Sequence, residues 1–432
     1  MRRKQGLVLL SFAPALALAA CRGPEAAPRG RVLLVGIDGA SPRVVERLAA
    51  EGRLPNLSRL AREGVHGHLR ADPPLWSPRI WSSIATGKSP EKHGITGFVN
   101  RPGEGPRRLL RSTDRRAHAL WNIASRSGLR VGVVNWWNSY PPEVVDGVIV
   151  SDDAVPNVAI ERRQMWKAGP TEGSAPAVHP ESWRERAHRI LSSGAPPVEA
   201  RDCFAGNAAL PPWVKAEKLS HAFQEDGRIA RLALEVEREI APGLLLVFLP
   251  GIDRVSHWLW GNFEPEGLYP ESLRPAPEAR REGLRCLLDY YDYTDALIGS
   301  LLARYGAQDL VLVVSDHGFE AGVLLGKLTG IHESEQARDG ILYARGPGIA
   351  PGGRTESGGQ PPAVNDVAPT ILAWLGLPVG ADMDGRPAPF LARPAPEAIA
   401  SWDTLPIEHV GGAGSEAEAA RLEALKELGY IE

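Results

Sequence analysis

Three segments of the chain share one pattern, in which an apolar run rich in branched side chains stops at an acidic residue. The runs occupy residues 31–37, 244–252 and 310–315 and end at Asp38, Asp253 and Asp316. A fourth apolar run covers residues 130–137. Continuous apolar runs without alternation are typical of strands that are buried on both faces of a parallel sheet.

Apolar residues at helical spacing lie between these runs. Residues 42–63 show this spacing with an interruption at 54–56, and the stretches 213–240 and 284–305 are longer. Alternating strands and helices predict an α/β fold with three layers, in which a doubly wound, mostly parallel sheet lies between helices. In such sheets ligands bind beyond the carboxyl ends of the strands. All three acidic residues are expected at those ends.

The first 20 residues are not expected to be part of the fold. A basic start precedes an apolar run at residues 7–20 that is too short to span a bilayer. The run ends in Leu-Ala-Ala-Cys21, which resembles a bacterial lipobox, where the chain is cut before the cysteine and acyl chains are attached to it. An ordinary secretory signal with a chance cysteine is the alternative. Residues 1–20 are therefore interpreted as a signal peptide and 21–30 as a lipid-anchored tether.

This interpretation places the protein outside the cytoplasm, anchored to a bacterial membrane and facing the periplasm or the cell surface. Export would permit a disulfide between Cys203 and Cys286, although two buried thiols are an equal interpretation. The formal net charge of -3 gives no reason to expect a nucleic-acid partner.

The rest of the chain is interpreted as one main domain with an insertion. Residues 31–154 and 213–432 are assigned to the main α/β domain. Residues 155–212, rich in proline, alanine and charged residues, are assigned to an insertion that caps the sheet and contains a helix at 181–193. Further helices are expected at residues 365–376 and 416–428.

Aspartate and histidine side chains gather near the predicted strand ends. Asp253 and His257 are four residues apart, so both can point the same way if a helix begins after the strand. Asp316 and His317 are adjacent at another strand end, and His332 follows in a loop flanked by glycine. Each group alone is a weak signal, because a single aspartate after a strand is more often a helix cap.

Asp38 completes the set, and the glycines beside it permit a tight turn. Hydrolases hold divalent metals with aspartate and histidine, and a two-metal site needs several such ligands that converge. These residues, in register with three strand ends, predict a two-metal site. The mixed oxygen and nitrogen ligands favour zinc over manganese or iron.

Ser77 is the candidate nucleophile. It precedes Pro78 at a predicted helix start, where the positive end of the helix dipole favours an anionic oxygen and an incoming phosphate. A bound metal can lower the pKa of a hydroxyl further, so no histidine base is required. The alternative is that Ser77 is only the helix N-cap, with Pro78 at the first helical position. The residues alone leave both interpretations open.

The order of these motifs resembles the type I phosphodiesterase and nucleotide pyrophosphatase family of the alkaline phosphatase superfamily. The resemblance rests on Asp38, on the Ser77 segment with Thr86-Gly87 and His93-Gly94, on Asp253 with His257, and on Asp316-His317 and His332. It covers most of residues 31–386. It implies an alkaline-phosphatase-like fold, two zinc ions and a covalent phospho-enzyme on the Ser77 hydroxyl.

The resemblance also implies how the ligands are divided. One metal would be held by Asp253, His257 and His332, and the other by Asp38, Asp316, His317 and the Ser77 oxygen. The implied activity is hydrolysis of phosphodiester or pyrophosphate bonds in a small phosphoester substrate.

Several positions depart from the eukaryotic-type members. Those members usually have threonine in place of Ser77, proline in place of Arg79 and, in place of Ile80, an asparagine that contacts a phosphoryl oxygen. Asn100, Arg79 or a backbone amide are the candidate replacements for that donor.

Four tryptophans flank predicted strand ends and are candidates to line a substrate pocket, with core packing as the alternative: Trp136, Trp137, Trp258 and Trp260. His93 is interpreted as structural and Lys88 as an exposed surface residue.

Other activities are compatible with the same metal ligands. Sulfatases need proline two residues and arginine four residues after the position of Ser77, where this chain has Arg79 and Trp81, so sulfatase chemistry is disfavoured. A phosphomonoesterase, a phosphonate hydrolase and a transferase of phospho-alcohol headgroups remain alternatives. A non-catalytic binding lipoprotein is disfavoured, because no metal ligand is lost.

Overall fold

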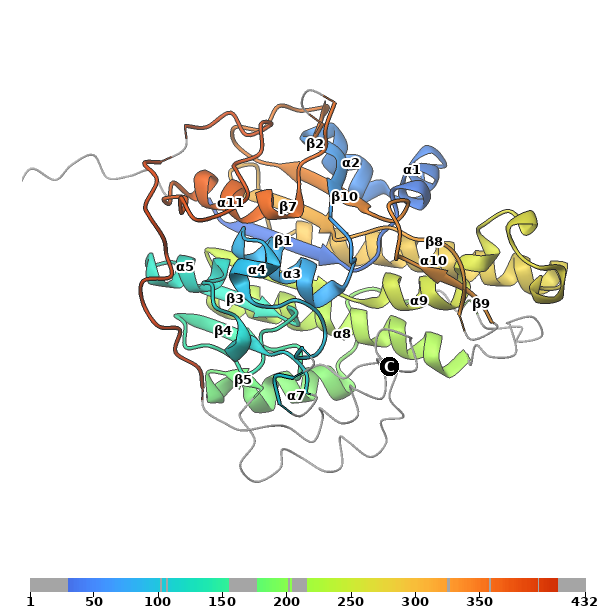
Figure 1. Ribbon diagram of the computed structural model, residues 1–432, viewed down its shortest axis with the longest axis horizontal. Coiled ribbons are helices and arrows are strands. Elements are labelled where there is room, and N and C mark those ends of the chain that lie inside the picture. Colours follow the sequence, from blue (N-terminus) through green and yellow to red (C-terminus); the bar gives the residue numbers. More distant parts are fainter. Residues whose placement is uncertain are drawn as a thin grey trace, which may run out of the picture.

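A computed structural model describes residues 30–410 except 102, 106–107, 155–176, 201–202, 204–215, 325–326, 357–358 and 395. Within these residues a nine-stranded sheet has the order β11-β2-β10-β7-β1-β6-β3-β4-β5 (Figure 1). Its strands are β1 (Val32–Ile37), β2 (Val65–Arg70), β3 (Val131–Val134), β4 (Gly147–Val150), β5 (Val178–His179), β6 (Leu244–Leu249), β7 (Leu310–Ser315), β10 (Asp339–Arg345) and β11 (Gly353–Arg354). The strands β8 (Glu320–Leu324) and β9 (Lys327–Ile331) form a separate antiparallel hairpin.

The sheet is mostly parallel, as predicted. β1 lies between β6 and β7 and is parallel to both, and β6, β3 and β4 continue the parallel arrangement. The antiparallel strand β10 joins β7 to β2, and β5 is antiparallel to β4 at the other edge. The four apolar runs are β1, β3, β6 and β7, and every residue of these strands is buried.

Helices cover both faces of the sheet, which confirms the three-layer architecture (Figure 1). One apolar cluster contains residues of α1 (Pro42–Ala50), α2 (Pro55–Glu63), α7 (Arg184–Ser193), α8 (Ala216–Ile240), α9 (Gly251–Leu259) and α10 (Pro277–Leu302). The other contains residues of α3 (Ser77–Thr86), α5 (Leu120–Arg126) and α11 (Val367–Leu375). Leu33 and Leu34 of β1 belong to different clusters, because successive side chains of a strand point to opposite faces.

Shorter helical pieces complete the described elements. They are α4 (Pro90–His93) and the 3-10 helices η1 (Ser112–Asp114), η2 (Glu181–Trp183), η3 (Trp260–Asn262), η4 (Glu266–Leu268), η5 (Glu271–Leu273) and η6 (Val364–Asp366). The interruption predicted at residues 54–56 separates α1 from α2, with Pro55 at the first position of α2.

The described part of the predicted insertion contributes the edge strand β5 to the sheet. β5 pairs with β4 at the sheet edge, and α7 contacts α8. The rest of residues 155–212, apart from 177–200 and Cys203, lies outside the described residues, so the cap stays a prediction. The same holds for residues 1–29, which include Cys21, and for the helix expected at 416–428. None of the helices in the described ranges is both long enough and apolar enough to cross a membrane.

Lys88 is buried, which contradicts the expectation of an exposed residue. Its side chain is 3% exposed, and its Nζ donates hydrogen bonds to Asp382 and Asp403 at 2.5 Å each. Asp403 also accepts a hydrogen bond at 2.8 Å from the backbone N–H of His118. Burial opposes the charge of Lys88, but the two hydrogen bonds outweigh it and raise its pKa. A lysine after a helix gave no sign in the sequence that two distant carboxylates would enclose it.

We expect Lys88→Met to destabilise the protein by about 1–3 kcal/mol at neutral pH, because two partly buried carboxylates lose their shared cation. Urea unfolding measures the loss. The matched control is Lys92→Met, which removes a more exposed pair with Asp384 and should cost less than about 1 kcal/mol.

The difference in the free energy of unfolding between Lys88→Met and the wild type should also depend on pH. Burial raises the pKa of Asp403, but hydrogen bonds from His118 and Lys88 outweigh burial and lower this pKa to about 2. A depressed folded pKa gives stability that is present above the unfolded value of about 4 and is lost as the pH falls toward about 2. The loss of unfolding free energy in Lys88→Met should therefore become smaller as the pH falls through this range. A loss that did not change with pH would contradict a stabilising bond between Lys88 and Asp403.

Candidate metal centre

The three acidic residues meet at one edge of the sheet. Asp38 follows β1 and Asp316 follows β7, while Asp253 lies in the first turn of α9 just after β6. Because β6 and β7 are the two neighbours of β1, their carboxyl ends lie side by side. The strand order of the sheet thus brings Asp38, Asp253 and Asp316, which are far apart in the sequence, into one cluster.

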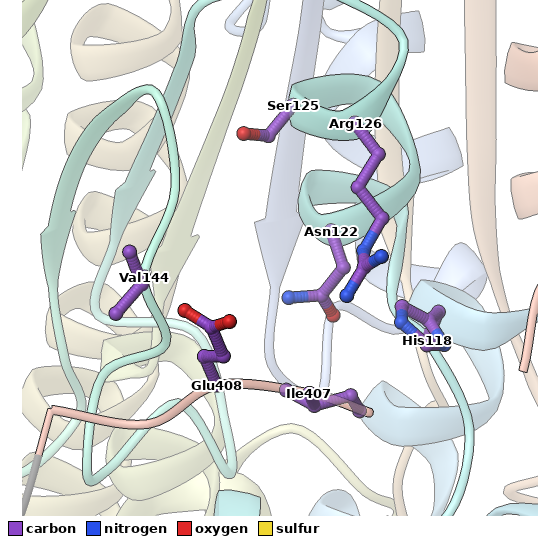
Figure 2. A pocket seen from close by; sticks show the side chains of 7 residues that line it. All are labelled: His118, Asn122, Ser125, Arg126, Val144, Ile407 and Glu408. Carbon is purple, nitrogen blue, oxygen red and sulfur yellow. The ribbon is translucent and has the colours of Figure 1, made fainter. Parts of the chain in front are cut away.

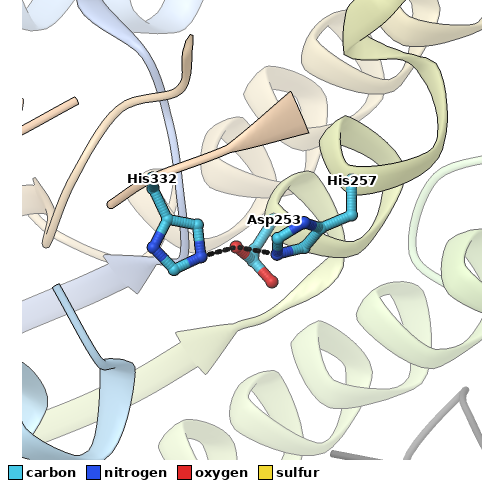
Figure 3. Close-up of side chains that lie close together, drawn as sticks. All are labelled: Asp253, His257 and His332. Carbon is cyan, nitrogen blue, oxygen red and sulfur yellow. Dashed lines mark ion pairs between the residues drawn. The ribbon is translucent and has the colours of Figure 1, made fainter. Parts of the chain in front are cut away.

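The first group of candidate ligands is Asp253, His257 and His332. Asp253 Oδ1 lies 3.5 Å from His257 Nε2 and 3.6 Å from His332 Nε2. The two imidazoles approach this carboxylate from opposite sides (Figure 3). The aspartate and the first histidine are one turn apart in α9, as their spacing predicts, and His332 follows β9.

The second group is Asp38, Asp316 and His317. His317 Nε2 lies 3.6 Å from Asp38 Oδ1 and 3.4 Å from Asp316 Oδ2. Within each group the ligand atoms lie within 4.8 Å of one another. The groups adjoin, because His317 Nε2 is 4.0 Å from Asp253 Oδ1 and its ring stacks on that of His332 at 3.9 Å.

Backbone carbonyls orient two of the imidazoles. The Nδ1 atoms of His257 and His317 lie 2.9 Å from the carbonyl oxygens of Gly330 and Gly318, respectively. A carbonyl oxygen can only accept, so Nδ1 of each ring carries a hydrogen and Nε2 is the atom that faces the carboxylates. The arrangement is the one that metal-binding histidines adopt.

Burial shifts the ionisation of the cluster. Burial, together with nearby Asp316 and Asp253, raises the pKa of Asp38 well above its usual value. The pKa of Asp316 is raised to about 7, mainly by burial. Burial lowers the pKa of His257, and it lowers that of His332 far below the usual value. Three carboxylates beside the imidazoles of His257 and His332, whose charged forms burial disfavours, form a site in which a divalent cation would relieve the repulsion.

Two polar atoms support the same conclusion. Asp316 Oδ2 and His317 Nε2 are buried and make no hydrogen bond within the described part of the chain. Buried polar atoms without partners are rare, and a metal ligand is one accepted explanation. The residues present therefore fit two divalent ions.

Ser77 borders the second group. Its Oγ donates a hydrogen bond to Asp38 Oδ1 at 3.3 Å, and its side chain is buried. The N-cap of α3 is Trp76, whose backbone is extended, and Ser77 is already the first helical residue. The interpretation of Ser77 as the N-cap is therefore wrong, and its hydroxyl is directed at a candidate metal ligand.

One glycine is required by the geometry. Gly39 has a φ of +69°, and its N–H donates to Asp316 Oδ1 at 3.1 Å. A Cβ at this position would lie 2.6 Å from the Phe319 ring. The glycine after Asp38 therefore lets the turn bring the two carboxylates together.

The predicted substrate contacts have local structural partners. The Asn100 side chain bonds to the backbone of residues 104 and 108, at 3.3 and 2.8 Å. The Arg79 guanidinium donates to the carbonyl oxygens of residues 72 and 74. Trp258 is half-buried and packs against the apolar core. These contacts favour structural roles, and substrate binding by these residues stays a prediction.

The other three tryptophans predicted to flank strand ends pack in the core, and a fourth tryptophan, which the sequence did not single out, is exposed. Trp136 and Trp260 are fully buried, and Trp137 packs against the core. Trp76, directly before Ser77, is 40% exposed. One signal in the sequence could have drawn attention to Trp76. It is a tryptophan directly before a predicted helix start, where serine, threonine and aspartate are preferred.

His93 has a structural environment. It is fully buried, its Nε2 lies 3.0 Å from Ser83 Oγ, and its Nδ1 accepts the N–H of Ile95 at 3.1 Å. Burial and nearby arginines lower its pKa to about 3, so it is neutral. Its contacts join α3 to α4, in keeping with the structural interpretation.

A separate cavity lies between α5 and the segment near residue 407 (Figure 2). It has a volume of about 240 Å³, and its lining residues are His118, Asn122, Ser125, Arg126, Val144, Ile407 and Glu408. None of the candidate metal ligands lines it.

Comparison with known proteins identifies a family. A family model for type I phosphodiesterase / nucleotide pyrophosphatase matches residues 32–350. This range contains Ser77 and all six candidate metal ligands. No curated protein matches the chain.

One solved structure shares the fold at low sequence identity, and two others are similar to a lesser degree. A 2-O GAG sulfatase has a TM-score of 0.52 and 14% identity over 86% of this chain and 76% of its own. A phosphonate monoester hydrolase from Silicibacter pomeroyi has a TM-score of 0.47 and 18% identity, covering 87% and 78% of the two chains. A phosphonoacetate hydrolase from Sinorhizobium meliloti has a TM-score of 0.41 and 18% identity, covering 69% and 58%.

Proposed function

We propose that this chain, which belongs to the type I phosphodiesterase/nucleotide pyrophosphatase family, hydrolyses phosphodiester or pyrophosphate bonds of a small substrate with Ser77 as nucleophile. Membership of this family makes it a hydrolase of the alkaline phosphatase superfamily. One observation carries the proposal: two adjoining groups of buried aspartate and histidine lie at the sheet edge, and the Ser77 hydroxyl is hydrogen-bonded to one of them.

The two groups would hold the two metals as their composition suggests. Asp253, His257 and His332 would bind one ion, and Asp38, Asp316 and His317 the other. Two divalent ions held by these residues would activate the nucleophile and neutralise charge on the leaving oxygen. Zinc is the proposed metal, because both groups offer imidazole and carboxylate ligands.

The chain itself positions the nucleophile. The Ser77 hydroxyl points toward Asp38, so its proton lies on the side of the carboxylate and an oxygen lone pair remains for attack. Ser77 would attack phosphorus, displace the leaving alcohol or phosphate and become a phosphoserine, which water then hydrolyses. The start of α3 favours the negative charge that gathers on the phosphoryl oxygens.

Ile80 distinguishes this site from the usual family pattern. Its side chain is buried in the core cluster that contains α3, so it offers no donor to a phosphoryl oxygen. A backbone amide at the start of α3 is the proposed substitute. Weaker stabilisation of the transition state than in relatives with the asparagine would follow.

We also propose export and lipid anchoring. The lipobox-like sequence before Cys21 supports both, and a flexible tether would hold the hydrolase close to the membrane surface.

The substrate class is tested with residues 22–432 loaded with zinc. We expect bis-p-nitrophenyl phosphate to be cut with at least about tenfold higher kcat/KM than p-nitrophenyl phosphate, p-nitrophenyl sulfate or a p-nitrophenyl phosphonate ester, which corresponds to about 1.4 kcal/mol of preferential transition-state binding. Release of p-nitrophenolate measures all four.

Each other outcome assigns a different activity. A preference for the monoester would make the protein a phosphatase. A preference for the sulfate would make it a sulfatase, and a preference for the phosphonate ester would make it a phosphonate hydrolase. Transfer of phosphate to an added alcohol in place of water would indicate a transferase. If no ester is cut by protein that holds two metals, the proposed function is wrong.

A further inference from the structure

Two cysteines from distant parts of the chain meet beside α10. Cys203 follows α7 in the predicted insertion, and Cys286 lies within α10, 83 residues later. The Cys286 thiol donates a hydrogen bond to the Cys203 carbonyl oxygen at 3.1 Å. The two thiols also interact, since a hydrogen bond to Cys286 is the largest cause that raises the pKa of Cys203. The sulfurs are therefore neighbours.

The approach of the two backbones is fixed by a second bond. Arg285, beside Cys286, donates from Nη2 to the same Cys203 carbonyl oxygen at 2.7 Å. Arg285 is itself held by Glu282 at 2.6 Å on the surface of α10. Two consecutive residues of one helix thus contact the same Cys203 carbonyl oxygen, which places the two cysteines beside each other.

Apolar packing surrounds the pair. Both cysteines are buried in the cluster that contains residues of α8 and α10, and both are thiols in this structure. Cys21 is the one other cysteine of the chain, and the lipobox-like sequence assigns it to acylation. Each of these two cysteines therefore has the other as its intramolecular partner.

We propose that Cys203 and Cys286 form a disulfide that joins the insertion to α10. The sulfur–sulfur bond forms as both S–H bonds break, and two electrons and two protons pass to a small disulfide oxidant, which becomes two thiols. Exchange requires a thiolate, and burial together with contact between the thiols disfavours one in the folded protein. The bond would therefore form mainly during folding and resist reduction afterwards.

The bond would close a long loop and restrict the unfolded chain. The two cysteines are 83 positions apart in sequence, and the segment between them contains α8, β6 and α9, which carries Asp253 and His257. We expect the oxidised protein to melt about 3–8 °C above the reduced protein. The kcat should stay within about twofold, because neither cysteine lies among the metal ligands or beside Ser77.

The test refolds the urea-unfolded full chain in a glutathione redox buffer at about pH 8.5, where an ordinary thiol is half ionised and the cysteines can exchange before they are buried. Samples are taken until the cysteine state no longer changes, then denatured, alkylated and mapped by mass spectrometry. The expected result is one peptide pair linked through Cys203 and Cys286, with the higher melting temperature in the same sample.

Two outcomes at the plateau would overturn the proposal: both cysteines alkylated, or either one bound to glutathione in place of its partner. The matched controls are Cys203→Ser and Cys286→Ser, whose melting temperatures should not respond to the redox buffer. The mapping by mass spectrometry is done on the wild-type chain, so it shows whether the disulfide forms even if a variant folds poorly. It does not depend on the proposed hydrolase activity.

Discussion

Ser77→Ala is expected to lower kcat for the preferred ester by about a thousandfold or more while leaving two metal ions bound per chain. Its side chain is buried at the start of α3 and is directed at Asp38, so the variant removes one oxygen and leaves the acidic and imidazole ligands in place. Loss of a covalent nucleophile usually has an effect of this size. Initial rates and metal analysis of the same sample measure both quantities.

Two companion variants make this result specific. Ser82→Ala removes another buried hydroxyl from the same helix, one that makes no hydrogen bond in the described structure, and should keep nearly full activity. Ser77→Thr keeps an oxygen at the reacting position and should retain activity well above Ser77→Ala. An active Ser77→Ala variant would remove the phosphoserine step from the mechanism. An inactive Ser82→Ala variant would show that disturbance of α3 explains the loss.

The sheet and most of the candidate metal centre could be predicted because their determinants are local. A strand buried on both faces needs a continuous apolar run, and β1, β6 and β7 each have one. An acidic side chain that follows such a run leaves the core at the carboxyl edge of the sheet. Asp38 and Asp316 are therefore found where the hydrophobic pattern places them.

Features that depend on contacts between distant residues could not be predicted in this way. The hairpin of β8 and β9, which positions His332, contains no long apolar run, and β5 is only two residues long. The carbonyl oxygens that orient the imidazoles belong to Gly330 and Gly318, and a backbone oxygen has no sequence signature. Only the assembled fold shows that Lys88 is enclosed by two carboxylates from the C-terminal part of the chain.

Asp253 occupies the position where the two candidate metal sites adjoin. Its Oδ1 lies within 4.0 Å of Nε2 atoms of three histidines, one of which belongs to the other group. Asp253→Asn keeps the shape of the side chain but removes a charge. We expect the variant to lose the ion at the His257 site, with at least about a hundredfold weaker binding, and to lose most activity. Metal analysis after dialysis against a weak chelator measures the loss.

The effect of Asp253→Asn on the melting temperature should have opposite signs with and without bound metal. In the metal-free protein Asp253 raises the pKa of both Asp38 and Asp316 by repulsion, so three buried carboxylates destabilise one another. Asp253→Asn relieves this repulsion, and the metal-free variant should melt above the metal-free wild type. With zinc present the wild type should melt higher, because it binds more metal in the folded state.

A buried carboxylate outside the centre provides the control. Asp295 accepts hydrogen bonds from the backbone of Asn56 and Leu57, so Asp295→Asn should lower the melting temperature with and without zinc and leave metal content unchanged. If Asp253→Asn behaved like Asp295→Asn, the cluster would be an ordinary hydrogen-bonded network. If only Asp253→Asn changes the sign of its melting-temperature shift when zinc is removed, the carboxylates of Asp38, Asp253 and Asp316 destabilise the metal-free fold. A bound cation would then offset this destabilisation.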